Sequence, residues 1–291
     1  MNHLKLVVPT VCQLGEGPQW LAESNQLLWV DIEAKEVHLF TPETNQHDTI
    51  PLPQRVGAVV PASNGSLLAA LEDGIYVLER SGKLTLLAEL EANHPHHRSN
   101  DGKVDAAGRL WIGTMPMKGS EWTGSLYSCD GTGLVTKHVG ELGCSNGMDW
   151  SKDGRTMYFI DSPTRRVDAF DFDVERGTIS NRRTVIEFDA ALGVPDGMCT
   201  DAEGRLWVAH WGGYCVTCSD PVTGKELKRI ELPVSQVTSC CFGGPNLSTL
   251  YITTARAWLS EERLKEEPLA GSVFSIEVEE KGKPNPLFLE R

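Results

Sequence analysis

The segment Asp105-Ala-Ala-Gly-Arg-Leu-Trp-Ile-Gly113 recurs almost unchanged as Asp201-Ala-Glu-Gly-Arg-Leu-Trp-Val-Ala209. A looser copy occupies residues 151–159, and fainter copies lie at 22–29, 62–68 and 244–251. Each copy is a polar turn, usually with glycine, followed by a short apolar segment, which is the pattern of a turn that leads into a β-strand. The chain is therefore built from an internal repeat.

Counting eight residues back from each turn gives one equivalent position in each copy. These positions are 41, 43, 46, 50 and 42 residues apart, a period that suits a unit of four short strands. The equivalent residues are Glu16, Gly57, Asn100, Asn146, Asp196 and Thr238.

Six such units predict an all-β fold: a six-bladed β-propeller with four-stranded antiparallel blades, in which residues 1–291 form a single domain. A β-sandwich with decorated loops is the alternative, but it would not repeat in register six times. Helical periodicity is nearly confined to Leu259–Glu267, which we expect to be a short surface segment.

The composition limits the classes of function. The chain has 291 residues, of which 40% are hydrophobic and 23% charged, and this composition argues against disorder. Its formal net charge of −13 makes nucleic acid a poor partner. No apolar run approaches the roughly 20 residues of a membrane span, and the first 14 residues lack the pattern of a signal peptide. We expect a soluble cytoplasmic protein that is a monomer or a weak homodimer and contacts no membrane.

The eight cysteines show no evenly spaced framework. Cys215 and Cys218 form the one Cys-x-x-Cys motif, but no second pair accompanies it as in a structural zinc site. We expect ordinary buried thiols and no disulfides, as in a reducing compartment.

The repeated position carries oxygen donors in four of the six units. The innermost strand of each blade lines a propeller's channel, so Glu16, Asn100, Asn146 and Asp196 should converge near the axis. Two buried carboxylates are costly there unless a cation compensates them, and hard divalent cations prefer oxygen ligands. The alternative is that Asn-Gly and Asp-Gly are merely common in turns. Four donors in register favour a metal site in the channel, with open positions for catalysis.

A histidine-rich loop precedes Asn100. His94, His96 and His97 invite a metal assignment, but Pro95 and their spacing suit a loop, and a lid or substrate rim is the favoured interpretation. Arg98 is expected at the channel mouth as a donor to a substrate oxygen; the alternative for it is a surface ion pair.

Several motifs together resemble the regucalcin/gluconolactonase family across essentially the whole chain. They are Gly15-Glu-Gly-Pro18, Ser99-Asn-Asp-Gly-Lys-Val-Asp105, Ser145-Asn-Gly-Met-Asp-Trp150, Val167-Asp-Ala-Phe-Asp171, the run from Val194 to Trp207, and Thr238-Ser-Cys-Cys-Phe-Gly-Gly244. The resemblance implies a six-bladed propeller that hydrolyses sugar lactones with one divalent metal in the channel.

Carried over residue by residue, the resemblance places the metal ligands on Glu16, Asn146 and Asp196 and the substrate contacts on Arg98 and Asn100. The repeat register alone does not separate Asn100 from the ligands. The family's acidic substrate-contacting residue falls on Lys118, and Glu121 could replace it only if the loop shifts. A lysine there suits a lactone with an anionic group.

The expected function is metal-dependent hydrolysis of a small sugar lactone to the aldonic acid. Asp196 is the predicted general base, and the cofactor is one divalent ion, with Ca²⁺, Mg²⁺ and Mn²⁺ the natural oxygen-loving candidates and Zn²⁺ and Fe²⁺ also compatible. The alternatives are a lactonase for an anionic 6-substituted sugar lactone, a non-catalytic calcium-binding or regulatory propeller, and a metal-dependent esterase or phosphotriesterase.

Overall fold

The first residue of each well-conserved copy is an aspartate whose side chain bonds to the turn and to the strand that follows it. One oxygen of Asp105 accepts hydrogen bonds from the backbone N–H groups of Ala107 and Arg109, and the other accepts from Arg109 Nε at 2.8 Å and Trp111 Nε1 at 2.9 Å. Asp201 makes the same four contacts with its own turn, arginine and tryptophan. Trp111 and Trp207 are both fully buried between blades, so the motif joins the turn to the core.

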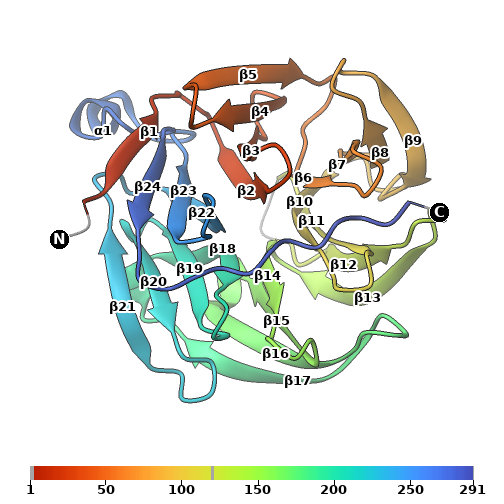
Figure 1. Cartoon of the computed structure of the whole chain (residues 1–291). Coiled ribbons are helices and arrows are strands. Elements are labelled where there is room, and N and C mark those ends of the chain that lie inside the picture. The colour runs from red at the N-terminus through yellow and green to blue at the C-terminus, as the bar shows by residue number, and fades with distance from the viewer. Residues whose placement is uncertain (1–2, 119–120, 291) are drawn as a thin grey trace.

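The computed structural model describes residues 3–118 and 121–290, and within them the strands form six four-stranded antiparallel sheets arranged as the blades of a propeller (Figure 1). Blade 1 consists of β2 (Gly15–Leu21), β3 (Gln26–Asp31), β4 (Glu36–Thr41) and β5 (Gln46–Pro51). Blade 2 consists of β6 (Ala58–Pro61), β7 (Leu67–Ala70), β8 (Gly74–Leu78) and β9 (Leu84–Glu89). Blade 3 consists of β10 (His97–Val104), β11 (Leu110–Pro116), β12 (Gly124–Cys129) and β13 (Val135–Leu142). The predicted fold class is confirmed.

The second half of the chain continues the ring. Blade 4 consists of β14 (Ser145–Trp150), β15 (Thr156–Asp161), β16 (Arg166–Asp173) and β17 (Thr178–Glu187). Blade 5 consists of β18 (Val194–Thr200), β19 (Leu206–Trp211), β20 (Cys215–Ser219) and β21 (Glu226–Glu231). Blade 6 consists of β22 (Val237–Gly243), β23 (Thr249–Thr254), β24 (Val273–Glu277) and β1 (Lys5–Val8). The short helices are η1 (Ser162–Thr164), η2 (Ala190–Leu192) and α1 (Glu261–Glu266).

Blade 6 differs from the simple repeat that the sequence predicts. Its last sequence unit supplies only three strands, and β1 from the other end of the chain adds the outermost one, with Lys5 opposite Ser275 and Leu6 opposite Phe274. The first and last strands of the described chain thus share one sheet, which closes the ring.

The segment after β24, residues 278–290, crosses one end of the channel (Figure 1). Its backbone bonds to Ala202 and Leu247 near its start and to Ser63 and Gly108 near its end, and Phe288 is fully buried. It therefore binds together blades 2, 3, 5 and 6 at the ends of their innermost strands.

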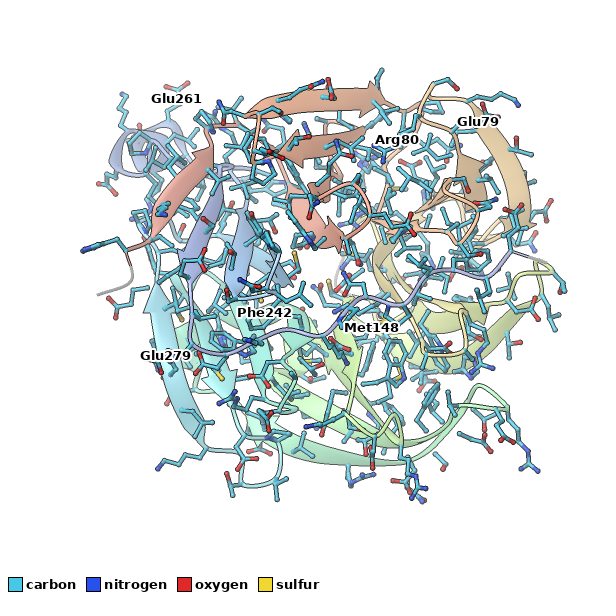
Figure 2. All side chains as sticks on the ribbon, viewed as in Figure 1. Glu79, Arg80, Met148, Phe242, Glu261 and Glu279 are labelled. Atoms are coloured by element: carbon cyan, nitrogen blue, oxygen red, sulfur yellow. The ribbon has the colours of Figure 1, made fainter. Side chains whose placement is uncertain are left out.

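Apolar side chains fill the spaces between neighbouring blades, while charged ones gather at the rim. Figure 2 shows the exposed Glu79, Arg80, Glu261 and Glu279 at the periphery and the buried Met148 nearer the centre. The helix α1 matches the predicted surface segment. No helix among the described residues is long and apolar enough to cross a bilayer.

All eight cysteines are free thiols, as predicted, and all but the half-buried Cys144 are buried. Cys215 and Cys218 lie on β20, as strand residues rather than in a redox motif.

Candidate active site

The repeated position coincides with a break in strand pairing. In β2, β10, β14, β18 and β22 the register with the neighbouring strand shifts at the repeated residue, for example between Glu16 and Gln19 and between Pro195 and Met198. A β-bulge interrupts the normal alternation and re-aims a side chain. The bulges therefore turn the repeated side chains toward the channel.

The glycines beside these residues serve two different purposes. Gly17 has a φ of +53°, a conformation that favours glycine. At Gly147 and Gly197 the reason is instead close approach of the next blade, because an added Cβ would lie 2.7 Å from the carbonyl oxygen of Asp196 and 2.1 Å from Ser239 Oγ respectively. Small residues at these two positions let the innermost strands pack tightly around the axis.

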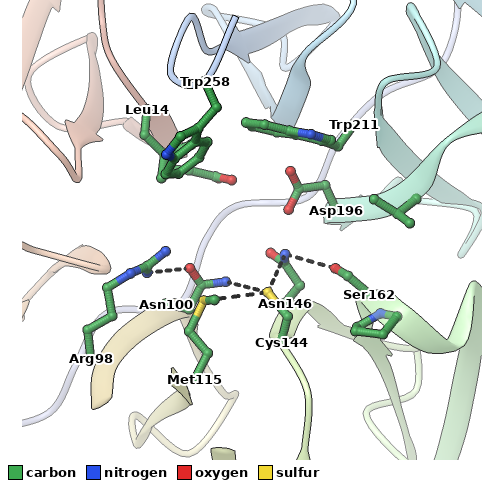
Figure 3. Close-up of a pocket in the computed structure, with 13 residues that line it drawn as sticks. Leu14, Arg98, Asn100, Met115, Cys144, Asn146, Ser162, Asp196, Trp211 and Trp258 are labelled. Atoms are coloured by element: carbon green, nitrogen blue, oxygen red, sulfur yellow. Dashed lines mark hydrogen bonds between the residues drawn. The ribbon is translucent and has the colours of Figure 1, made fainter. Parts of the chain in front are cut away.

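A cavity of about 380 Å³ opens where the innermost strands begin (Figure 3). It brings together all three predicted metal ligands and two of the predicted substrate contacts, and it adds a largely apolar wall. The lining residues are Leu14, Glu16, Arg98, Asn100, Met115, Cys144, Asn146, Ser162, Pro163, Val194, Asp196, Trp211 and Trp258.

Arg98 and Asn100 form a fixed, buried pair. Arg98 donates to Asn100 Oδ1 at 2.6 Å and to the carbonyl oxygen of Ser99 at 2.9 Å, while Asn100 Nδ2 donates to the carbonyl oxygen of Ser145 at 2.9 Å. Burial lowers the pKa of the Arg98 guanidinium from its ordinary value. Asn100 thus anchors the arginine to blade 4, and Arg98 supplies a positive charge at the cavity.

Glu16 and Asp196 lack comparable compensation. Burial raises the pKa of Glu16 well above its usual range, and repulsion from Asp196 and Asp101 raises it further. Burial and repulsion from Asp101 raise the pKa of Asp196 in the same way. Two carboxylates in this setting are unfavourable in their charged form unless a cation joins them.

Asn146 completes the set of oxygen donors. Its Nδ2 donates to Ser162 Oγ at 3.0 Å and its amide also bonds to Asp196, but its Oδ1 is buried without a hydrogen-bond partner. A buried amide oxygen is normally paired, so this one is available as a ligand atom. The three residues therefore fit a divalent cation by charge, by donor type and by an unused oxygen.

Two predicted positions lie apart from the cavity. Lys118 and Glu121 are exposed and are not among its lining residues, and Gly119 and Ser120 between them lie outside the described residues. Contact of either side chain with substrate stays a prediction. None of His94, His96 and His97 lines the cavity either, so the structure gives no support to a rim formed by their side chains.

The repeat does not reveal the apolar half of the cavity. The rings of Trp211 and Trp258 lie 5.9 Å apart, across the cavity from Arg98 and Asn100 (Figure 3), and Trp258 is 72% exposed. Cys144 lies beside Asn146, and burial together with Asp196 raises the pKa of its thiol to about 12, so it stays protonated. The one signal for this wall in the sequence is Trp258 itself, a large aromatic residue in the short segment between β23 and α1.

The chain is similar to known proteins over nearly its whole length. Residues 14–256 match the family model described as the SMP-30/Gluconolactonase/LRE-like region. Human regucalcin is 41% identical over 284 residues. A Bacillus subtilis protein with the name "Putative sugar lactone lactonase YvrE" is 39% identical over 278 residues, and each alignment covers 95% of both chains. The solved structure of a calcium-binding protein, regucalcin, from Agrobacterium tumefaciens superposes with a TM-score of 0.95 at 33% identity, covering 99% of this chain and 97% of the other. The chain belongs to the SMP-30/gluconolactonase/LRE-like family.

Proposed function

We propose that this protein is a metal-dependent sugar lactone hydrolase that converts an aldonolactone and water to the aldonic acid. The observation that carries the proposal is the meeting of two uncompensated carboxylates and the unpaired Asn146 Oδ1 in one cavity. A lactonase name on a relative that matches the whole chain supports this activity class.

Glu16, Asn146 and Asp196 would hold the cation. When bound, the cation supplies Lewis-acid polarisation of the lactone carbonyl and balances the negative charge that develops on its oxygen. Because only two of the three ligands are carboxylates, the affinity for Ca²⁺ should be weaker than that of a dedicated calcium loop.

Asp196 is the residue we assign as general base. Hydrolysis requires a proton to leave the attacking water as its oxygen bonds to the carbonyl carbon, and a proton to reach the ring oxygen as the ring C–O bond breaks. A buried carboxylate at the cavity can accept the first proton and return it for the second.

The remaining lining residues position the substrate. The Arg98 guanidinium, held by Asn100, can donate hydrogen bonds to ring hydroxyls on one side of the cavity. The Trp211 and Trp258 rings offer an apolar surface to the C–H face of a sugar ring on the other side and displace water from it.

The test is acid release from a panel of aldonolactones, including glucono-, galactono-, arabinono- and xylonolactone and one with an anionic 6-substituent. The protein is first treated with a chelator, and single divalent metals are then added back. We expect metal-dependent rates well above spontaneous hydrolysis, and a preference for the anionic lactone would assign Lys118 to the substrate.

Metal binding without acceleration of any lactone would overturn the proposal and leave a binding propeller. Faster cleavage of simple esters or phosphotriesters than of every lactone would assign a different hydrolase to the same site.

A further inference from the structure

A second group of metal-ligating side chains lies outside the cavity. Glu91 follows β9, His97 begins β10, and His94 lies in the turn between them. The side chains of Glu91 and His97 are 2% and 9% exposed, whereas that of His94 is 62% exposed. One carboxylate oxygen and two ring nitrogens of these residues all lie within 4.8 Å of one another.

Surrounding groups orient the two buried members. Glu91 Oε1 accepts hydrogen bonds from Thr114 Oγ1 at 2.8 Å and from the Tyr127 hydroxyl at 3.0 Å, which leaves Oε2 free to face the histidines. His97 Nε2 is paired with Thr123 Oγ1 at 2.9 Å. Such outer hydrogen bonds are what fix the tautomer and orientation of metal-binding histidines.

The inner atoms of this group do not satisfy each other. His97 Nδ1 is buried without a hydrogen-bond partner, and it lies 3.4 Å from Glu91 Oε2. The hydrogen bond between His97 Nε2 and Thr123 Oγ1 can run in either direction. When Thr123 donates, an Nδ1–H faces Glu91 Oε2. When Nε2 donates, Nδ1 carries a lone pair, and two electron-rich atoms face each other in a buried place. A cation between them removes this repulsion.

We propose that Glu91, His94 and His97 form a second metal site, separate from the channel, that binds a transition-metal ion such as Zn²⁺. Bonds of 2.0–2.1 Å in a tetrahedral site separate the ligand atoms by roughly 3.3 Å. The Glu91–His97 pair is already at 3.4 Å, and His94 Nε2 lies 3.9 Å from Glu91 Oε2. The ring of His94 is stacked on that of His97, with the ring centres 5.1 Å apart, so His94 must turn out of this stack before its nitrogen can face the same ion. Its side chain is exposed and has room for this turn, which would complete three ligands with the solvent side open to water.

The ligand types decide which ion is preferred. Two imidazoles and one carboxylate suit Zn²⁺ and similar borderline ions, whereas Ca²⁺ and Mg²⁺ prefer oxygen ligands alone. The two sites of this chain therefore differ in chemistry: oxygen donors in the channel and mainly nitrogen donors at the histidine loop.

The other group with ligand-like spacing, Cys12, Asp31 and His38, is already satisfied. Asp31 accepts from the backbone N–H groups of Gln13, Leu14 and Ala34, and His38 Nδ1 is paired with His47 Nε2 at 3.0 Å. Burial raises the pKa of the Cys12 thiol to about 11, so this sulfur stays protonated. Of the two groups with ligand-like spacing among the described residues, the Glu91 group is therefore the one with unused ligand atoms.

A bound ion would fix the strand that presents substrate contacts. His97 directly precedes Arg98 on β10, and Thr114, which holds Glu91, precedes the cavity residue Met115 on β11. The proposed site thus joins the loop before β10 to the edge of the candidate active site, and it acts by positioning rather than by touching substrate.

The experiment titrates chelator-treated protein with Zn²⁺ by calorimetry, and with Co²⁺ by visible absorption as a spectroscopic probe. A Glu16→Gln/Asp196→Asn background, shown to be folded by circular dichroism, removes the channel ligands. We expect one Zn²⁺ per chain in this background, at least tenfold weaker binding after His94→Ala, and no change after His96→Ala, the matched control on the neighbouring exposed histidine.

In the chain without the background substitutions, His94→Ala should lower bound Zn²⁺ by one equivalent. No Zn²⁺ binding in the folded background, or equal binding by the His94→Ala and His96→Ala variants, would overturn the proposal. Neither readout depends on lactonase activity, so the result is independent of the proposed function.

Discussion

Both ends of the central channel contain buried carboxylates, but these carboxylates are paired with positive charge to very different degrees. At the mouth, Glu16 and Asp196 share one positively charged side chain among the residues that line the cavity, that of Arg98, and Asn146 Oδ1 is unpaired. At the far end, Asp149 lies between Lys103 Nζ at 3.2 Å and Lys283 Nζ at 2.8 Å. Burial alone would raise the pKa of Asp149, but the two lysines hold it well below its usual range.

The difference separates a structural ion cluster from a binding site. Lys103 also donates to the carbonyl oxygen of Met198, Lys283 to that of Trp150, and Asp149 accepts from the backbone N–H of Thr200, so the far-end groups satisfy one another. Lys283 belongs to the segment that crosses this end of the channel. The mouth is left with a surplus of negative charge, and this surplus is the reason we propose a cation site there.

The largest effect is expected from a substitution at the mouth of the channel. Asp196→Asn keeps the shape but removes a negative charge and the proposed base, so turnover should fall by 10²–10⁴-fold. Steady-state kinetics at saturating metal, with bound metal measured directly, checks this. Asp48→Asn is the control, since Asp48 is an exposed aspartate that does not line the cavity, and it should leave turnover unchanged. A near-normal rate in the metal-loaded Asp196→Asn variant would show that Asp196 is not the general base.

The next largest effect is a loss of stability expected from a substitution at the far end of the channel. Asp149→Ala leaves Lys103 and Lys283, which are both partly buried, without their partner. We expect the free energy of unfolding to fall by about 3 kcal/mol, the lower end of the range for breaking a buried ion pair. Denaturant unfolding measures it, with the exposed Asp48→Ala, expected within about 0.5 kcal/mol of the original chain, as control. A loss as small as that of the control would show that the cluster is not held together by Asp149.

The smallest effect is expected in how the free energy of unfolding depends on pH at the mouth of the channel. Because the pKa of Glu16 is raised in the folded state, its contribution to stability is greatest below its unfolded value near 4.5 and is lost as pH rises toward the raised pKa. Metal-free protein should therefore lose stability relative to Glu16→Gln by up to about 1.4 kcal/mol per pH unit in that window.

Parallel denaturant unfolding of both forms from pH 4 to pH 9 tests this, and saturating divalent metal should reduce the difference. A difference that does not change with pH in the metal-free proteins would contradict the uncompensated state of Glu16.

The parts of the molecule that the sequence predicts are those that repeat. The turns at Asp105 and Asp201 carry their contacts within six residues, so local sequence determines them, and the register then places Glu16, Asn146 and Asp196 on equivalent strands. The pairing of β1 with β24 has no such signal, because β1 lacks the repeat motif. The Trp258 wall and the orientation of Glu91, whose φ is +55°, depend on loop conformations that residue spacing does not encode.

The shared sheet of blade 6 has a consequence for how the chain folds during synthesis. Lys5 is made first among the paired residues but must wait for Ser275, so this contact spans almost the full length of the chain. Contacts of such separation carry a high loop-closure entropy and form late. Until β1 docks, the outer edge of β24 stays unpaired and can accept a strand from another molecule. The open edge of β24 is therefore a place where the nascent ring can pair with another molecule, and we expect substitutions in β1 to lower the yield of folded protein.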